Sequence, residues 1–163
     1  FFSKARCYVC HSGPALNSME FYALGMPNLI GNGIYGSNPD DAAHKGRGGF
    51  TLRTEDMFKY KVPQLYNLKD SKFYGHGGNF RSVHDVIAYK NNGVAADNTV
   101  PASQISNEFR ALNLNDEEIA AITAFLEKSL YDPNLTRYEP NRIPSGQCFP
   151  NDDLISRLDR GCN

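Results

Sequence analysis

The chain has 163 residues, 17 basic and 18 acidic side chains, and a formal net charge of −1. This length suits one domain that buries about two-thirds of the surface its unfolded form exposes. The charge balance argues against a nucleic-acid footprint or a basic membrane-surface patch. The sequence also lacks an apolar run near the roughly 20 residues of a membrane span. We therefore expect neither nucleic acid nor a bilayer as a partner.

The most informative pattern comes first along the chain. Cys7 and Cys10 are separated by two residues and followed at once by His11. This spacing lets both thiols bond to the vinyl groups of one haem while the imidazole reaches its iron. A redox disulfide would need a thioredoxin-like βαβ pattern, and a zinc site would need a second ligand pair. Neither follows, so the motif predicts one covalent haem c with His11 as proximal axial ligand.

The residues before the motif contain no recognisable signal sequence and begin at Phe1 rather than methionine. Phe1 and Phe2 have the pattern of a helix interior rather than of a capped start, so we expect a mature or cut product. Haem attachment of this type belongs to an exported, oxidising compartment, the periplasm in a bacterium. In that compartment we expect Cys148 and Cys162 to form a disulfide. The alternative is that both remain reduced as buried thiols.

Residues 12–60 show little regular periodicity and many turn signals, which predicts a long loop covering one haem face. His44 and His84 are expected on the surface. The residues expected to line the haem face are apolar or aromatic: Tyr8, Phe21, Tyr22, Leu24, Met26, Leu29, Ile30 and Ile34.

The segment 58–68 is predicted to be extended, because Pro63 excludes a helix interior. It leads into a glycine-rich turn at 73–80 that carries His76. A helix should follow, with Ser82 as its N-cap and its end by Gly93. One face of this helix would carry Val83, Val86, Ile87 and Lys90.

The clearest predicted helix is the last one. Asn115 is its expected N-cap and Glu118 stands at the capping-box position. Apolar residues then repeat at helical spacing up to Leu130, before Asp132 and Pro133 end the helix. We expect this helix to pack across the amino-terminal segment. The expected fold class is mainly α, with a cytochrome c-like haem domain at 1–135, long loops, and an irregular carboxy-terminal surface tail at 136–163.

Motifs spread over the chain strengthen this interpretation. They are residues 1–14 around the haem motif, Lys61-Val62-Pro63-x-Leu65-x-Asn67-Leu68, Phe73-Tyr74-Gly75-His76-Gly77, Leu114-Asn115-x-Glu117-Glu118 with Ala124-Phe125-Leu126, and Pro144-Ser145-Gly146-x-Cys148-Phe149-Pro150-Asn151-Asp152. In this order they resemble the carboxy-terminal haem domain of the bacterial di-haem cytochrome c peroxidase and MauG family. The resemblance extends over essentially the whole chain.

The resemblance implies a role in electron transfer, but this chain differs from the family in its number of haem motifs. Family members have two cytochrome-like domains, each with its own Cys-x-x-Cys-His motif, whereas this chain has one such motif. The part present resembles the half that relays electrons, so peroxide chemistry is not assigned to these residues alone. The implied partner is a redox protein or a second haem-bearing domain or polypeptide. The alternative is a stand-alone mono-haem electron-transfer cytochrome without peroxidase activity.

The resemblance also places the second axial ligand on the helix after the glycine-rich turn. Counting from Lys61-Val62-Pro63, that position falls on Lys90, with Tyr89 beside it. Neighbouring helical residues point about 100° apart, so one of them at most faces the iron. A lysine ligand must be deprotonated, whereas a phenolate would favour ferric iron. The remaining candidates are Met19, Met26, Met57, His76 and a water-bound or open site.

Two further site features follow from the resemblance. His76 is expected near the haem edge, where a structural hydrogen bond is the expected role. A calcium ion lies between the two domains in the family, held partly by main-chain carbonyls just before the glycine-rich turn. In this chain those carbonyls belong to Ser71 and Phe73, and the other ligands would come from the second domain.

Overall fold

The computed structural model describes residues 1–28, 38–133 and 143–148, together with residues 158 and 161. The chain divides into two compact units, Phe1–Asp132 and Pro133–Asn163. The division comes slightly before the 135/136 boundary expected from sequence. Cys162 lies outside the described residues, so the disulfide with Cys148 stays a prediction.

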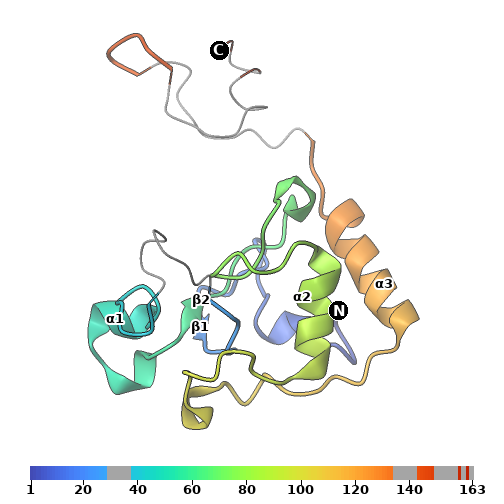
Figure 1. Cartoon of the computed structure of the whole chain (residues 1–163). Coiled ribbons are helices and arrows are strands. Elements are labelled where there is room, and N and C mark those ends of the chain that lie inside the picture. The colour runs from blue at the N-terminus through green and yellow to red at the C-terminus, as the bar shows by residue number, and fades with distance from the viewer. Residues whose placement is uncertain (29–37, 134–142, 149–157, 159–160, 162–163) are drawn as a thin grey trace. The chain divides into compact units, whose positions relative to one another are not determined.

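In its described residues, the larger unit combines short helices with one small sheet (Figure 1). Its helices are α1 (Arg47–Thr51), α2 (Val83–Asn92) and α3 (Asp116–Ala124). Strands β1 (Phe21–Tyr22) and β2 (Tyr60–Lys61) pair antiparallel, with Phe21 opposite Lys61 and Tyr22 opposite Tyr60. Long loops connect these elements. No helix among the described residues has both the length and the apolar character needed to cross a bilayer.

Helix α2 begins and ends where its capping residues predict. The Ser82 hydroxyl accepts a hydrogen bond from the Asp85 backbone N–H at 3.0 Å, which satisfies one of the free amides of the first turn. Gly93 ends the helix in the left-handed conformation, at φ 65°, and its N–H donates to the Tyr89 carbonyl. Both predicted ends of this helix are confirmed.

Gly93 also supports a stability prediction. A Cβ at this position would overlap the backbone of Arg110 and Ala111, and the positive φ adds strain for any other L-residue. Gly78 has the same φ of 65°, but a Cβ there would meet only the Phe73 Cβ at 3.7 Å. We expect Gly78→Ala to cost about 1 kcal/mol from backbone strain, and Gly93→Ala to cost at least about 2 kcal/mol more. Denaturant unfolding of the two haem-loaded variants measures the difference, and equal midpoints would contradict it.

Helix α3 has the predicted capping box. The Asn115 side chain accepts from the Glu118 N–H at 2.9 Å, and the Glu118 carboxylate accepts from the Asn115 N–H at 2.9 Å. The helical path continues past Ala124 as one π-helical turn, Phe125–Ser129. The helix therefore extends as far as its apolar spacing predicted, with a wider last turn.

The end of this turn is tied to the segment that follows β2. The Asn67 backbone N–H donates to the Leu130 carbonyl at 3.1 Å. The Asn67 side chain donates to the Asp132 carbonyl at 2.9 Å and accepts from the Asp132 N–H at 2.8 Å. Asn67 itself is left-handed, at φ 55°, a conformation that asparagine adopts more readily than most residues. One side chain thus joins two distant parts of the chain.

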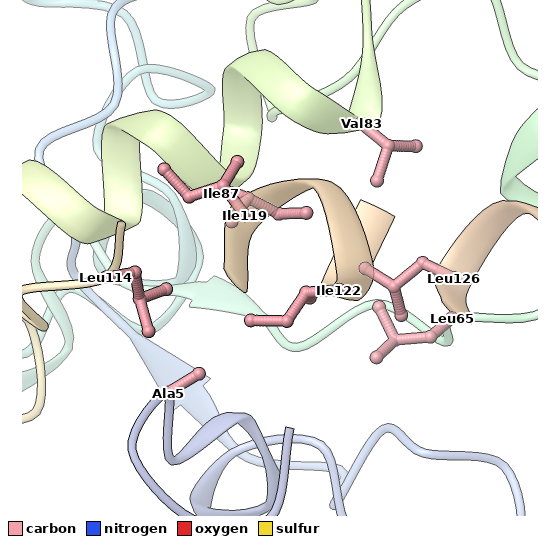
Figure 2. Packing of buried hydrophobic residues seen from close by; sticks show 8 residues of the cluster. All are labelled: Ala5, Leu65, Val83, Ile87, Leu114, Ile119, Ile122 and Leu126. Carbon is pink, nitrogen blue, oxygen red and sulfur yellow. The ribbon is translucent and has the colours of Figure 1, made fainter. Parts of the chain in front are cut away.

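The hydrophobic core lies between α2, α3 and the amino-terminal segment (Figure 2). Eight buried residues form the cluster: Ala5, Leu65, Val83, Ile87, Leu114, Ile119, Ile122 and Leu126. Helices α2 and α3 contribute half of them, and the close-up shows their side chains pointing toward one another. Burial of such side chains is the main favourable term in folding.

The amino-terminal segment packs against α3 as expected. Ala5 enters the core, the Phe1 ring lies 5.4 Å from the Phe125 ring, and Lys4 forms an ion pair with Glu118 at 2.7 Å. The expectation that Phe1 and Phe2 lie inside a helix is wrong, because regular helix here is limited to one 3₁₀ turn at Cys7–Val9.

Two observations explain the missing helix. Arg6 adopts a left-handed conformation, at φ 52°, which breaks any helix running into the haem motif. The two aromatic rings also pack on different partners, since Phe1 contacts Phe125 while Phe2 stacks on Tyr8.

Candidate cofactor site

A cavity of about 520 Å³ lies in the larger unit. Its walls come from the amino-terminal segment, the chain following β2, one face of α2, α3, and the loop between these two helices. Apolar side chains make up most of the lining. The volume is within the range of about 300–1,000 Å³ that small-molecule and cofactor sites occupy.

Cys7, Cys10 and His11 line this cavity together. The 3₁₀ turn brings them to one side, because the N–H groups of Cys10 and His11 both donate to the Cys7 carbonyl, at 3.3 and 2.8 Å. Burial raises the pKa of both thiols, so they are protonated and neutral at neutral pH. The three side chains of the motif therefore meet at one apolar surface.

The imidazole of His11 is held in a defined tautomer. Its Nδ1 lies 2.9 Å from the Leu16 carbonyl, and since a carbonyl only accepts, Nδ1 carries the proton. The lone pair therefore resides on Nε2. Burial also lowers the pKa of His11, which keeps the ring neutral. A neutral imidazole whose other nitrogen donates to a backbone carbonyl is the usual form of a histidine metal ligand. These residues fit a covalently attached haem.

Of the two predicted distal candidates, Lys90 lines the cavity. It shares the cavity-lining face of α2 with Val83, Val86 and Ile87, at the i, i+3, i+4 and i+7 positions. Burial lowers the pKa of its amine. The neutral form that can donate a lone pair is therefore more accessible than in an exposed lysine.

Tyr89 points elsewhere. Its hydroxyl lies 2.7 Å from the carbonyls of both Leu24 and Gly25, and its ring stacks on Phe109 at 5.1 Å. It is not among the residues that line the cavity. The structure thus separates these two neighbours, as the 100° rotation between helical positions requires.

The three methionines that are candidate ligands lie in different places relative to the cavity. Met26 lines the cavity. Met19 is 65% exposed and Met57 packs against Gly48, so neither of these two reaches the cavity lining.

The expected haem-facing residues of the early loop divide in a similar way. Tyr22 and Leu24 line the cavity with Met26. Tyr8 does not, because it is 44% exposed and stacks on Phe2. Phe21 does not either, because successive strand residues point to opposite faces, and its ring packs under the Arg47 guanidinium. The remaining three, Leu29, Ile30 and Ile34, lie outside the described residues.

His76 lines the cavity from the glycine-rich turn. Its ring stacks on the Tyr60 ring with centroids 3.7 Å apart and an interplanar angle of 8°. The ring is crowded by protein atoms although the residue as a whole is open to solvent. This desolvation, with a smaller effect from His44, lowers the pKa of His76 to about 4.

The carbonyls of Ser71 and Phe73 both accept hydrogen bonds. The Tyr74 hydroxyl donates to the Ser71 carbonyl at 2.9 Å, and the Ser71 hydroxyl donates to the Phe73 carbonyl at 2.7 Å. No group of three or more His, Cys, Asp or Glu side chains suited to a metal occurs in the part of the chain that is described. Calcium at these carbonyls stays a prediction that needs ligands from elsewhere.

One expectation about histidine is wrong. His44 was expected on the surface, but it is 4% exposed and lines the cavity, with hydrogen-bond partners at both ring nitrogens. Its partner Thr99 is 55 residues away in sequence. No local pattern around His44 indicates such a contact. His84, in contrast, is exposed as expected.

Comparison with known proteins gives a consistent result. No protein-family model matches the chain. It is 28% identical over 145 residues to cytochrome-c peroxidase IdrP1 of Denitromonas iodatirespirans. The aligned region covers 78% of this chain and 37% of that protein. It is 25% identical over 168 residues to cytochrome-c peroxidase IdrP2 of the same organism, covering 88% of the chain and 42% of that protein. The chain thus spans about two fifths of the length of these relatives.

A solved structure extends the likeness to the fold. The chain superimposes on a MauG-like protein associated with microbial copper homeostasis with a TM-score of 0.63 and 25% sequence identity. The match covers 80% of this chain and 41% of the other. It supports the cytochrome c-like fold expected from the sequence.

Proposed function

Because the chain is a relative of the bacterial di-haem cytochrome c peroxidases and MauG proteins, we propose that it is their electron-relay haem domain, carrying one covalent haem c. The observation that carries this proposal is that Cys7, Cys10 and His11 line one apolar cavity together. The Nδ1–H of His11 donates to the Leu16 carbonyl, which leaves Nε2 free to bind a metal. Bound there, the haem would supply a one-electron ferric/ferrous couple.

The residues of the chain have distinct parts in this function. The thiols of Cys7 and Cys10 would anchor the haem, and Nε2 of His11 would bind its iron on one side. Lys90 stands in the same cavity as the candidate for the other side. The apolar wall from α2 and α3 would lower the dielectric around a bound haem, which would strengthen the influence of nearby charges on the iron.

Electron relay is a better fit than peroxide cleavage for the chain alone. The sequence holds one Cys-x-x-Cys-His motif, and the chain corresponds to about two fifths of its relatives. Two internal ligands would leave the iron without an open coordination position for peroxide. We propose that a second haem-bearing domain or polypeptide provides that open position. We place both in an exported compartment. We also propose that the carbonyls of Ser71 and Phe73 contribute to a calcium site between this domain and the second one.

A pyridine haemochrome spectrum and native mass spectrometry test this function together. We expect covalent haem c at one per chain, and a companion polypeptide with its own haem in the native sample. A chain of 18.2 kDa with one haem and no companion would instead identify a stand-alone electron-transfer cytochrome. Absence of covalent haem from the unaltered protein would overturn both functions.

A further inference from the structure

A series of hydrogen bonds joins His44, Thr99 and Asp97 beside the cavity, apart from the haem-binding motif. His44 is 4% exposed, and the Asp97 side chain is 9% exposed. The His44 Nε2 is 2.9 Å from the Thr99 hydroxyl, which lies 2.6 Å from the Asp97 carboxylate. The Asp97 carboxylate also accepts from the Thr99 N–H at 2.9 Å and comes within 3.6 Å of the His44 Nε2. Both His44 and Asp97 line the cavity.

The hydrogen bonds indicate where the protons are. The Asn28 side-chain amide donates to the His44 Nδ1 at 2.8 Å, so Nε2 carries the ring proton and donates to the Thr99 oxygen. The Thr99 hydroxyl then donates to the Asp97 carboxylate. The series of hydrogen bonds therefore runs from the His44 imidazole through the Thr99 hydroxyl to the Asp97 carboxylate, an order along which a proton can be redistributed.

A second histidine, His76, is linked to this series of hydrogen bonds through Tyr60. His76 stacks on Tyr60, whose hydroxyl donates to the His44 carbonyl. The titratable groups that act on His76 through space are His44 and Asp97, and Asp97 also acts on Tyr60. Burial, together with Asp97, raises the pKa of Tyr60 to about 12, so its phenol stays neutral. His44, His76 and Asp97 form what we call the acid–base cluster.

We propose that the acid–base cluster takes up one proton from solvent when the haem in this cavity is reduced. The inference rests on the proposed haem function. In the hydrogen-bond arrangement described above, His44 Nδ1 accepts from Asn28 and the Asp97 carboxylate accepts from Thr99, so both side chains hold lone pairs that a further proton could use. An electron added to the iron brings a negative charge to the same low-dielectric cavity, so a proton on the cluster becomes more favourable.

The step balances without a further reactant. Ferric iron gains one electron from a one-electron donor and becomes ferrous, and one proton moves from solvent onto the cluster. Because the three groups interact, the proton belongs to the cluster rather than to one residue. No covalent bond between heavy atoms forms or breaks.

A spectroelectrochemical titration of the haem-loaded protein between about pH 4, near the pKa of His76, and about pH 9 tests the proposal. One proton per electron changes the reduction equilibrium tenfold per pH unit, equivalent to about 59 mV. We expect the midpoint potential to fall with pH at up to this slope within that window. The slope should decrease strongly in His44→Gln, His76→Gln and Asp97→Asn.

The matched control is His84→Gln, which removes an exposed histidine on α2 that does not line the cavity and should leave the slope unchanged. Proton uptake can also be followed in the unaltered protein, with an indicator dye in weakly buffered solution during reduction. This measurement decides the question even where a variant fails to fold. Reversible reduction with a pH-independent midpoint and no proton uptake would overturn the proposal but leave the haem function intact. A chain without haem would instead remove the proposed function itself.

Discussion

The Cys7→Ala/Cys10→Ala variant, freed of non-covalent haem by extraction, is expected to lose cooperative unfolding. The core of this chain is small, and a cavity of about 520 Å³ adjoins it. An apolar cavity costs about 24 cal/mol per Å³, so one of this size costs up to roughly 12 kcal/mol, less wherever it opens to solvent. A whole domain is stable by only about 5–15 kcal/mol. Without haem, little stability is left.

Circular dichroism during heating, together with an NMR spectrum of the amide protons, measures this effect. The haem-loaded protein should unfold in one sharp transition, whereas the haem-free variant should show a broad, weak change and few dispersed amide resonances. The single variant Cys10→Ala is the control, since it keeps one thioether and the His11 ligand and should retain the sharp transition. A haem-free double variant that melts cooperatively near the temperature of the unaltered protein would contradict the expectation.

Lys90→Ala is expected to convert the ferric haem from a low-spin to a high-spin form. The amine shares the cavity with the haem-binding motif, and the substitution removes the lone pair without adding a new ligand. Burial lowers the pKa of Lys90, so the neutral amine persists to lower pH than in an exposed lysine. Acidification should nevertheless protonate it eventually and produce the same high-spin spectrum in the unaltered protein. Absorption and electron paramagnetic resonance spectra across a pH titration measure both changes.

Tyr89→Phe is the matched control for Lys90→Ala. It keeps the ring stacked on Phe109 and removes only the hydroxyl that contacts the Leu24 and Gly25 carbonyls. We expect its spin state to match that of the unaltered protein. A high-spin spectrum in Tyr89→Phe together with an unchanged one in Lys90→Ala would reverse the assignment. A sulfur-to-iron charge-transfer band that disappears in Met26→Leu would instead identify Met26, which also lines the cavity.

The features that sequence predicted correctly depend on neighbouring residues. The caps of α2 and α3 involve side chains within a few positions of the amides they satisfy, so Ser82, Gly93, Asn115 and Glu118 could be identified from local spacing. The separation of Lys90 from Tyr89 follows from helical geometry in the same way. Local chemistry determines these features.

The wrong expectations depend on contacts distant in sequence or on single backbone angles. His44 is buried because Thr99 and Asp97 come from a loop beyond α2. Tyr8 stays outside the cavity because it stacks on Phe2, and the left-handed Arg6 prevents a helix that apolar spacing favoured. A pattern of apolar residues records which side chains prefer burial but not which partners they find.

Asn67 has a mechanical consequence. Its three hydrogen bonds, to Leu130 and in both directions to Asp132, lie immediately before Pro133, where the smaller unit begins. A pulling force applied to the carboxy-terminal residues would therefore load these parallel bonds before it reached the turns of α3 that pack on the cavity. The hydrogen bonds of Asn67 would carry part of this force, so less of it would reach the residues that line the cavity.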